Sequence, residues 1–356
     1  MTFFRYFLSP NSVGSIINLS AKIPMLLSLL SVISFLISFL VVALIKQRFS
    51  QQFLDIPNER SSHSQPTPRG GGLGFVVAFA LTSSLSYFLF SPSLPLIPLW
   101  LSLTPLIIIG LLDDRRGIPS SIRYLVQLSS ASVAVTFFGA FPQSWLLDLG
   151  FGGKILAIIL TIIGLTAIIN FYNFMDGLDG LVAGCTVLQL GFLALYFQQP
   201  ILWLLVAALV GFLFWNWSPA KIFMGDVGST SLGAIVPMVL LNNQGNQSQA
   251  WSALTITFPL IGDAIYTLIC RLFRKENIFQ AHRSHLYQRL QKSGLSHSQV
   301  AIIYMGVTLL IAISINYLGN LGAWLSLPLI IGLIVLGEIY LNSRVSKHNL
   351  AVTRKE

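Results

Sequence analysis

The sequence predicts an all-α, polytopic integral membrane protein with about eleven transmembrane helices. Of its 356 residues, 54% are hydrophobic and only 9% are charged, whereas a soluble globular protein carries about 25% charged residues. Apolar runs of about 20 residues recur along the chain, and each is long enough to cross about 30 Å of hydrocarbon. Because lipid offers no hydrogen-bond partners to the backbone, we expect the spanning elements to be helices.

The expected spans follow one another through short connections, which predicts a single transmembrane domain. They cover residues 25–45, 71–90, 95–112, 122–141, 154–172, 180–197, 201–217, 229–242, 251–270, 299–318 and 321–341. Residues 1–24 are expected to form an extramembrane leader, because they lack the small-residue cleavage site of a signal peptide. Residues 25–342 then form the transmembrane domain and 343–356 a cytoplasmic tail.

Basic residues alternate between the connections and predict the orientation. The odd-numbered connections and the tail carry them, whereas the even-numbered connections carry essentially none. Since Lys and Arg are retained on the cytoplasmic side, the N-terminus is expected outside and the C-terminus in the cytoplasm. The fifth connection, residues 173–179, has no basic residue, so parity alone places it inside. The net charge of +9 lies in these short segments and does not indicate a nucleic-acid partner.

Most of the twelve acidic residues are expected on the cytoplasmic face. Nine fall there: Asp55, Glu59, Asp113, Asp114, Asp176, Asp179, Asp226, Glu276 and Glu356. Asp148 is expected outside, whereas Asp263 and Glu338 fall within spans. The adjacent carboxylates of Asp113 and Asp114 repel each other at the end of an apolar helix, and a divalent cation would offset that repulsion.

The segment NFYNFMDGLDGL adds oxygen ligands to this face. Asn170, Asn173, Asp176 and Asp179 recur at steps of three, so they lie on nearby faces wherever the helix persists. Amide and carboxylate oxygens suit Mg²⁺, with Mn²⁺ as an alternative, and the absence of a Cys or His triad close by in the sequence argues against zinc.

Two glycine-containing segments have different interpretations. In NWSPAKIFMGDVGS, Asp226 lies between Gly225 and Gly228, which predicts a tight turn whose backbone amides approach an anion. The GGGLG run at residues 70–74 lacks the GK[ST] ending of a nucleotide-binding loop and opens an apolar span. Those glycines are expected to permit close helix packing.

The largest cytoplasmic connection contains AHRSHLYQRL. Its spacing places His282, His285 and Arg289 on one face of an expected helix. A metal pair is one interpretation, but these side chains also suit a phosphate, which we favour. Acids for a metal and basic donors for phosphate beside a membrane together indicate phosphoryl transfer to or from a lipid.

With these motifs in hand, the chain resembles the polyprenyl-phosphate N-acetylhexosamine-1-phosphate transferase family. The resemblance covers DIPNERSSHSQPTPRGGG, DDRRGIPSSIRYLVQ, NFYNFMDGLDGL, NWSPAKIFMGDVGS and AHRSHLYQRL. It implies transfer of an N-acetylated sugar 1-phosphate from a UDP-sugar to undecaprenyl phosphate, with Mg²⁺ required and UMP released. UDP-GlcNAc or a deoxy relative is the implied donor. The product would start O-antigen or cell-wall glycan synthesis, and a homodimer is left open.

The resemblance also implies a role for each matching residue. Asn173 and Asp226 would bind the metal. Asp113, Asp114 and Asp176 would be the catalytic acids beside the reacting phosphates. The substrate would be bound by Asp179, Asn216, Phe223, Arg123, His282, His285, Arg289 and Arg60. Within this set, Asn216 and Phe223 match positions that hold uracil.

Departures from the family pattern favour one branch, and two other functions stay open. AHRSHLYQRL lacks the run of three histidines of the phospho-MurNAc-pentapeptide translocase, so we favour the O-antigen-initiating branch. A secondary transporter is the alternative from another class, although such proteins place charges near the middle of the membrane. A CDP-alcohol phosphotransferase is the enzymatic alternative, although its downstream Ala-Arg and spaced aspartates do not follow the Asp176-Gly177 pair.

Overall fold

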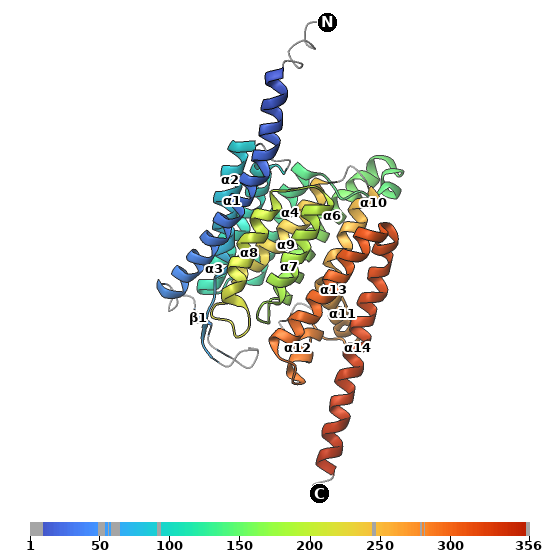
Figure 1. The fold of residues 1–356 in the computed structure, drawn as a ribbon. Helices are drawn as coiled ribbons and strands as arrows, with labels where there is room; N and C mark the ends of the chain where they lie inside the picture. The colour runs from blue at the N-terminus through green and yellow to red at the C-terminus, as the bar shows by residue number, and fades with distance from the viewer. Residues whose placement is uncertain are drawn as a thin grey trace.

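The computed structural model describes residues 10–48, 54–55, 57, 65–90, 94–243, 247–277, 280 and 282–353, and this part of the chain is a helical bundle (Figure 1). Its helices are α1 (Pro10–Arg48), α2 (Gly72–Phe90), α3 (Leu96–Arg116), α4 (Ser120–Phe138), α5 (Ser144–Leu147), α6 (Gly150–Met175), α7 (Leu181–Tyr196), α8 (Leu202–Asn216), α9 (Gly225–Asn242), α10 (Gln247–Leu254), α11 (Phe258–Phe273), α12 (Leu286–Lys292), α13 (His297–Leu318) and α14 (Asn320–Thr353). The 3₁₀ turn Thr255–Thr257 joins α10 to α11.

Each expected span except 251–270 coincides with a single helix, and the all-α prediction for a polytopic membrane protein is confirmed. Among the described residues, seven helical segments are long and apolar enough to cross a membrane: Pro24–Arg48, Gly72–Leu89, Leu96–Arg116, Gly150–Met175, Gln247–Phe273, His297–Leu318 and Asn320–Arg344. Helices α7 and α8 are apolar but shorter, at 16 and 15 residues. Helices α4 and α9 carry more polar side chains.

Two expectations about the span ends change in detail. Helix α1 begins at Pro10, so part of the expected leader continues the first span as helix. The expected span 251–270 is interrupted by the 3₁₀ turn, which is followed by Pro259 in the first turn of α11. Proline has no N–H to continue the hydrogen-bond ladder, so a change of helix there is expected.

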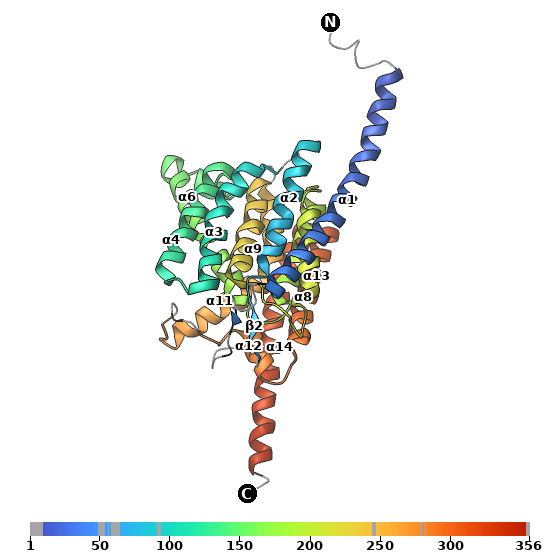
Figure 2. The same cartoon turned by 90° about the vertical axis from the view of Figure 1, so that its left-hand side faces the viewer.

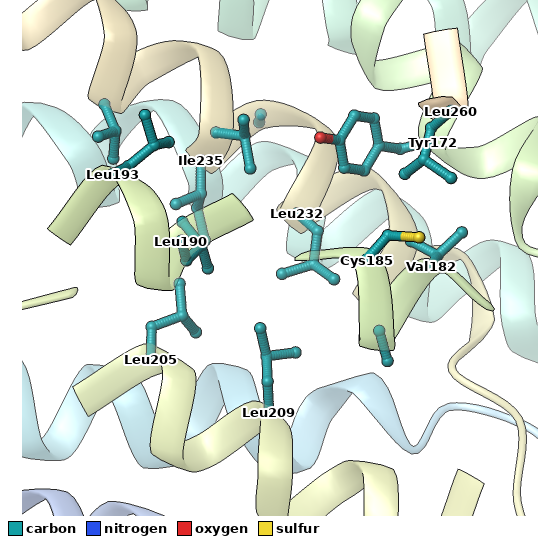
Figure 3. Close-up of a cluster of buried hydrophobic side chains, with 14 of the residues drawn as sticks. Tyr172, Val182, Cys185, Leu190, Leu193, Leu205, Leu209, Leu232, Ile235 and Leu260 are labelled. Atoms are coloured by element: carbon teal, nitrogen blue, oxygen red, sulfur yellow. The ribbon is translucent and has the colours of Figure 1, made fainter. Parts of the chain in front are cut away.

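Helix α9 lies at the centre of the bundle (Figure 2). Every residue from 227 to 241 is buried, and α9 packs against α3 and α6. Figure 3 shows Leu232 and Ile235 of α9 among Leu190 of α7, Leu205 of α8 and Tyr172 of α6. Because this helix touches so many neighbours, the residues at its N-terminus are held rigidly relative to the rest of the bundle.

One end of the bundle is built from short polar segments. Figure 1 shows β1 and α12 at the end from which α14 projects, whereas α1 begins beyond the opposite end. Strand β1 (Leu54–Asp55) pairs antiparallel with β2 (Thr67–Pro68), and Asp55 Oδ1 accepts a hydrogen bond from Arg69 Nη2 over 2.7 Å. The backbone then continues into the glycine run, where Gly71 and Gly72 donate to the carbonyls of residues 223 and 224, each over 2.9 Å.

The prediction that the glycine run permits close packing is confirmed. A Cβ added to Gly72 would lie 2.4 Å from Cα of Gly228 in α9, and one added to Gly74 would lie 2.4 Å from a methyl carbon of Val42 in α1. Neither position has room for a side chain. The run therefore seats α2 against two neighbouring helices at the end that carries β1 and α12.

We predict that Gly72→Ala destabilises the protein by about 1–3 kcal/mol, the usual cost of overpacking a close contact. The change in stability is measured by thermal unfolding in detergent, which is detected through the reaction of the buried Cys185 with a thiol-reactive fluorophore as the protein unfolds. Gly306→Ala is the control, because a Cβ there meets nothing within 4 Å and alanine favours a helix. Equal melting temperatures for Gly72→Ala and the unmodified protein would contradict the close contact.

Candidate active site

The turn between α3 and α4 brings a basic side chain back to the paired aspartates. Helix α3 ends at Arg116, and Gly117 has a φ of 68°, a left-handed conformation that favours glycine. Gly117 N donates to Asp113 O over 2.9 Å. Because α4 begins at Ser120, Arg123 lies beside α3, and its Nη1 donates to Asp113 Oδ2 over 2.8 Å.

The second aspartate of the pair caps α9. Asp114 is 6% exposed, and its two oxygens accept from Asp226 N over 2.9 Å and Val227 N over 3.3 Å. A carboxylate at this position satisfies free amides and stabilises the positive end of the helix. The approach depends on Gly110, because a Cβ there would lie 2.6 Å from Val227 Cα. Asp114 therefore fixes where α9 begins, and its assignment as a catalytic acid stays a prediction.

Asp226 lies in the first turn of α9. The predicted tight turn between Gly225 and Gly228 is wrong, because the helix already begins at Gly225 and contains Gly228. The backbone amides here do approach an anion, and that anion is Asp114. Arg123 Nη1 donates to Asp226 Oδ2 over 2.7 Å. One guanidinium thus joins carboxylates from α3 and α9.

The predicted row of inward-facing residues along α6 is only partly present. Asn170 Nδ2 donates to Gln127 Oε1 of α4 over 2.6 Å, one turn away from the acids. Asn173, in the last turn of α6, donates through Nδ2 to Ser229 Oγ of α9 over 3.0 Å, and its side chain is close enough to Asp226 to act against the rise in the pKa of that carboxyl. The structure therefore brings Asn173 and Asp226, the two predicted metal ligands, together.

Asp176 follows α6 directly and faces the other acids of this end. Burial, together with the charges of Asp226, Asp114 and Asp179, raises the pKa of Asp176 well above its usual range. Its ionised form is therefore costly unless a cation lies nearby. This is the electrostatic environment expected beside a divalent metal ion.

Asp179 is held by the protein itself. Its Oδ1 lies 3.2 Å from His297 Nδ1, and its Oδ2 accepts from Ala220 N over 3.1 Å. Burial raises the pKa of Asp179, but the hydrogen bond and charge of His297 and the Ala220 amide outweigh burial, so the pKa is lowered overall. Asp179 thus stays ionised while it ties α13 to the loop after α8.

Asn216 and Phe223 flank that loop. The buried Asn216 accepts from Gly180 N over 3.1 Å and donates to Ile222 O over 3.0 Å. Phe223 N donates to Pro68 O over 2.7 Å, and its side chain is half-buried. These contacts hold the two loops in place, and the roles of both residues toward uracil stay predictions.

The oxygen ligands gathered here fit a magnesium ion shared with a substrate. Among the described residues, no group of three or more His, Cys, Asp or Glu side chains could hold a metal ion alone. Mg²⁺ is commonly bound by one or two carboxylates, with water and substrate phosphates completing its octahedron. Asn173 and Asp226 meet that requirement, with the carboxyl groups of Asp113 and Asp176 as neighbours.

The histidine segment differs from its prediction. A shared helix face for His282, His285 and Arg289 is wrong, because α12 begins at Leu286 and the two histidines precede it. The first two amides of α12 donate to the Asp263 carboxylate of α11, which caps the helix at that point. The imidazole rings still lie together, with centroids 4.8 Å apart.

Two predicted substrate contacts have specific electrostatics. Burial, with the charges of His285 and Arg271, lowers the pKa of His282 to about 4. His282 is therefore neutral at pH 7 and can approach a phosphate only as a hydrogen-bonding group. Arg289 donates from both terminal nitrogens to Glu338 of α14, with Nη2 2.8 Å from Oε2. Its role toward substrate stays a prediction.

The structure adds polar residues that none of the sequence motifs includes. Asp263 caps α12, and Glu338 pairs with Arg289 of α12. The sequence signal for both is an ionisable residue within an expected span. His297 gave no such signal, since its partner Asp179 is distant in the sequence. Arg60, a predicted substrate contact, lies outside the described residues.

Comparison with known proteins identifies the family of the chain. The model of "Glycosyl transferase family 4" matches residues 96–243, which carry α3 to α9. The chain is 29% identical over 333 residues to a "Probable undecaprenyl-phosphate N-acetylglucosaminyl 1-phosphate transferase" of Bacillus subtilis, covering 86% of this chain and 90% of that protein. It is 32% identical over 293 residues to the "Decaprenyl-phosphate N-acetylglucosaminephosphotransferase" of Mycobacterium tuberculosis, covering 70% and 72%.

A relative from the peptidoglycan branch also matches. The "Phospho-N-acetylmuramoyl-pentapeptide-transferase" of Staphylococcus saprophyticus is 27% identical over 333 residues, covering 83% of this chain and 98% of that protein. The matched region contains the Arg123 site. The chain is therefore a membrane phosphotransferase and belongs to glycosyl transferase family 4, the family of polyprenyl-phosphate N-acetylhexosamine-1-phosphate transferases.

Proposed function

We propose that this protein transfers an N-acetylhexosamine 1-phosphate from a UDP-sugar to undecaprenyl phosphate and releases UMP. The observation that carries the proposal is the Arg123 guanidinium, which joins Asp113 and Asp226 directly beside Asn173 and Asp176. Such a site offers cationic and anionic groups side by side, as transfer of a phosphoryl group between two phosphates requires. The names of the relatives from Bacillus subtilis and Mycobacterium tuberculosis support the same reaction.

The proposed topology has eleven crossings, with the N-terminus outside and the C-terminus in the cytoplasm. Support comes from the alternation of basic connections. Helices α1 and α14 also project from opposite ends of the bundle, as an odd number of crossings requires (Figure 1). The acidic site then lies on the cytoplasmic face of the inner membrane, where a soluble nucleotide sugar and a lipid phosphate can both reach it.

Within this site we assign Asn173 and Asp226 to the magnesium ion, which, when bound, neutralises charge on the donor diphosphate. Asp176 lies beside them, and its raised pKa is consistent with a position that needs a nearby cation. Arg123 supplies a second positive charge, from α4, where negative charge develops on the departing UMP. The lipid phosphate, with a second pKa near 6, is already largely ionised at neutral pH and needs no strong base.

Asp113 is the residue we assign to the acceptor. Its carboxylate is held by Arg123 over 2.8 Å, so it is oriented toward the same guanidinium as Asp226. In direct attack, an acceptor oxygen forms the new bond to the sugar-proximal phosphorus as the bond to UMP breaks. Asp113 orients that acceptor and takes any remaining proton.

The proposed donor is UDP-GlcNAc or a deoxy relative, and the product would enter O-antigen or cell-wall glycan synthesis. The relatives from Bacillus subtilis and Mycobacterium tuberculosis are both named for N-acetylglucosamine, which supports GlcNAc as the first sugar to test. His282, His285 and Arg289 are proposed to face the sugar and diphosphate. The segment that carries them lies beside the loop after α6 that holds Asp176 and Asp179, because Tyr287 of α12 contacts the end of α6.

We predict that purified protein, given undecaprenyl phosphate and Mg²⁺, releases UMP from UDP-GlcNAc or from one of its deoxy relatives in a panel of UDP-sugars. UMP release and radiolabelled lipid product are the two measurements. Omitting the lipid or chelating the metal should remove both signals. A panel in which no UDP-sugar yields UMP would count against the proposed reaction.

Direct attack makes a separate prediction about partial reactions. Without lipid acceptor, the protein should not exchange labelled UMP into the UDP-sugar, because no sugar-phosphate would be held on a protein side chain. Incubation with labelled UMP, UDP-sugar and Mg²⁺ measures that exchange. Label appearing in UDP-sugar in the absence of lipid would show a covalent intermediate and would rule out the one-step mechanism.

A further inference from the structure

The carboxylate of Asp263 connects parts of the molecule that are distant in sequence. It lies in α11, is 1% exposed, and is not among the acids of the Arg123 site. Its oxygens accept from the following groups: Leu286 N over 2.9 Å, Tyr287 N over 3.0 Å, Tyr304 Oη over 2.7 Å and Thr267 Oγ1 over 3.1 Å. A buried carboxylate with this many donors holds α12 firmly against α11 and α13.

The same carboxylate lies beside the imidazole of His285. His285 Nδ1 is 3.7 Å from Asp263 Oδ1 and has no hydrogen-bond partner among the residues that the structure describes, although His285 is only 2% exposed. Its ring is stacked on Tyr287, with centroids 5.7 Å apart, and also meets Phe174. A small rotation would bring the nitrogen to the carboxylate. Asp263 therefore sets both the start of α12 and the environment of a predicted substrate contact.

Tyr287 of α12 also contacts the end of α6, directly before the loop that holds Asp176 and Asp179. Tyr287 Oη donates to Phe174 O over 2.8 Å, which satisfies one of the free carbonyls at the end of α6. That carbonyl lies between Asn173 and Asp176 in the sequence. A Cβ added to Gly177 would lie 2.2 Å from Tyr287 Oη, so the loop has no side chain at the point where the tyrosine enters.

We propose that Asp263 and Tyr287 are positioning residues that couple the histidine segment to the metal-binding end of α6. This inference rests on the proposed function for its catalytic meaning. Asp263 fixes the first turn of α12, that turn carries Tyr287, and the tyrosine hydroxyl fixes the last turn of α6 with Asn173. A shift of the histidine segment around a sugar diphosphate is thereby passed on to the residues that hold the magnesium ion.

The test removes one hydroxyl at a time. Tyr287→Phe breaks the bond to Phe174 and keeps the ring, whereas the matched Tyr304→Phe breaks a bond to the same Asp263 carboxylate from α13 and leaves the bond to Phe174 intact. Hydrogen–deuterium exchange of residues 173–180 and the Mg²⁺ concentration giving half-maximal UMP release are measured for both. Both variants should show similar, small losses of thermal stability.

We expect Tyr287→Phe to raise exchange in 173–180 about fivefold, the effect of losing one hydrogen bond, and to raise the half-maximal Mg²⁺ concentration with little change in kcat at saturating metal. Tyr304→Phe should change neither. Exchange in Tyr287→Phe equal to that in Tyr304→Phe would overturn the coupling, whether or not the protein releases UMP. Raised exchange in a protein that releases no UMP would support the coupling and reject the proposed function instead.

Discussion

The cap that Asp114 forms on α9 determines the geometry of the end of the bundle that carries Asp113, Asp176 and Asp226. Its carboxylate accepts hydrogen bonds from the amides of Asp226 and Val227, the second and third residues of α9, at a point where Gly110 lets the helices approach closely. This contact sets the position of Asp226 relative to Asp113, so that one arginine, Arg123, can hydrogen-bond to both. Backbone amides left without partners at a helix terminus near a membrane cost free energy. The Asp114 carboxylate satisfies two of these amides, and the same contact fixes the position of the site.

Carboxylates from several helices converge here, and the protein only partly neutralises them. Arg123 pairs with both Asp113 and Asp226, but burial and the neighbouring Asp113 still raise the pKa of Asp226 to about 6. His297 and the Ala220 amide lower the pKa of Asp179. Burial and the charges of Asp226, Asp114 and Asp179 raise the pKa of Asp176 as well. The remaining negative charge is concentrated where Asn173 presents an amide to α9. A divalent cation with phosphate ligands would balance this charge, which relates the electrostatics of the end to the proposed reaction.

Much of the fold was predictable from the sequence, because a segment that spans a lipid bilayer has to be an apolar helix of about 20 residues. The apolar runs predicted the helices, and the motifs predicted the family and the pairing of Asn173 with Asp226. What failed depended on contacts between distant segments. The helix expected around His282 begins later because Asp263, about twenty residues earlier in the chain, caps it. The turn expected at Asp226 is helix because Asp114 caps it.

Binding of Mn²⁺ tests the central claim that these carboxylates form a divalent-cation site. Electron paramagnetic resonance of the detergent-solubilised protein with UDP-sugar should show one bound Mn²⁺ that Mg²⁺ displaces. Asp226→Asn should weaken that binding by about tenfold or more, because a charged ligand becomes neutral. Asp148→Asn, which changes an exposed acid after α5, should bind like the unmodified protein. Equal Mn²⁺ affinity in Asp226→Asn and the unmodified protein would contradict the claim.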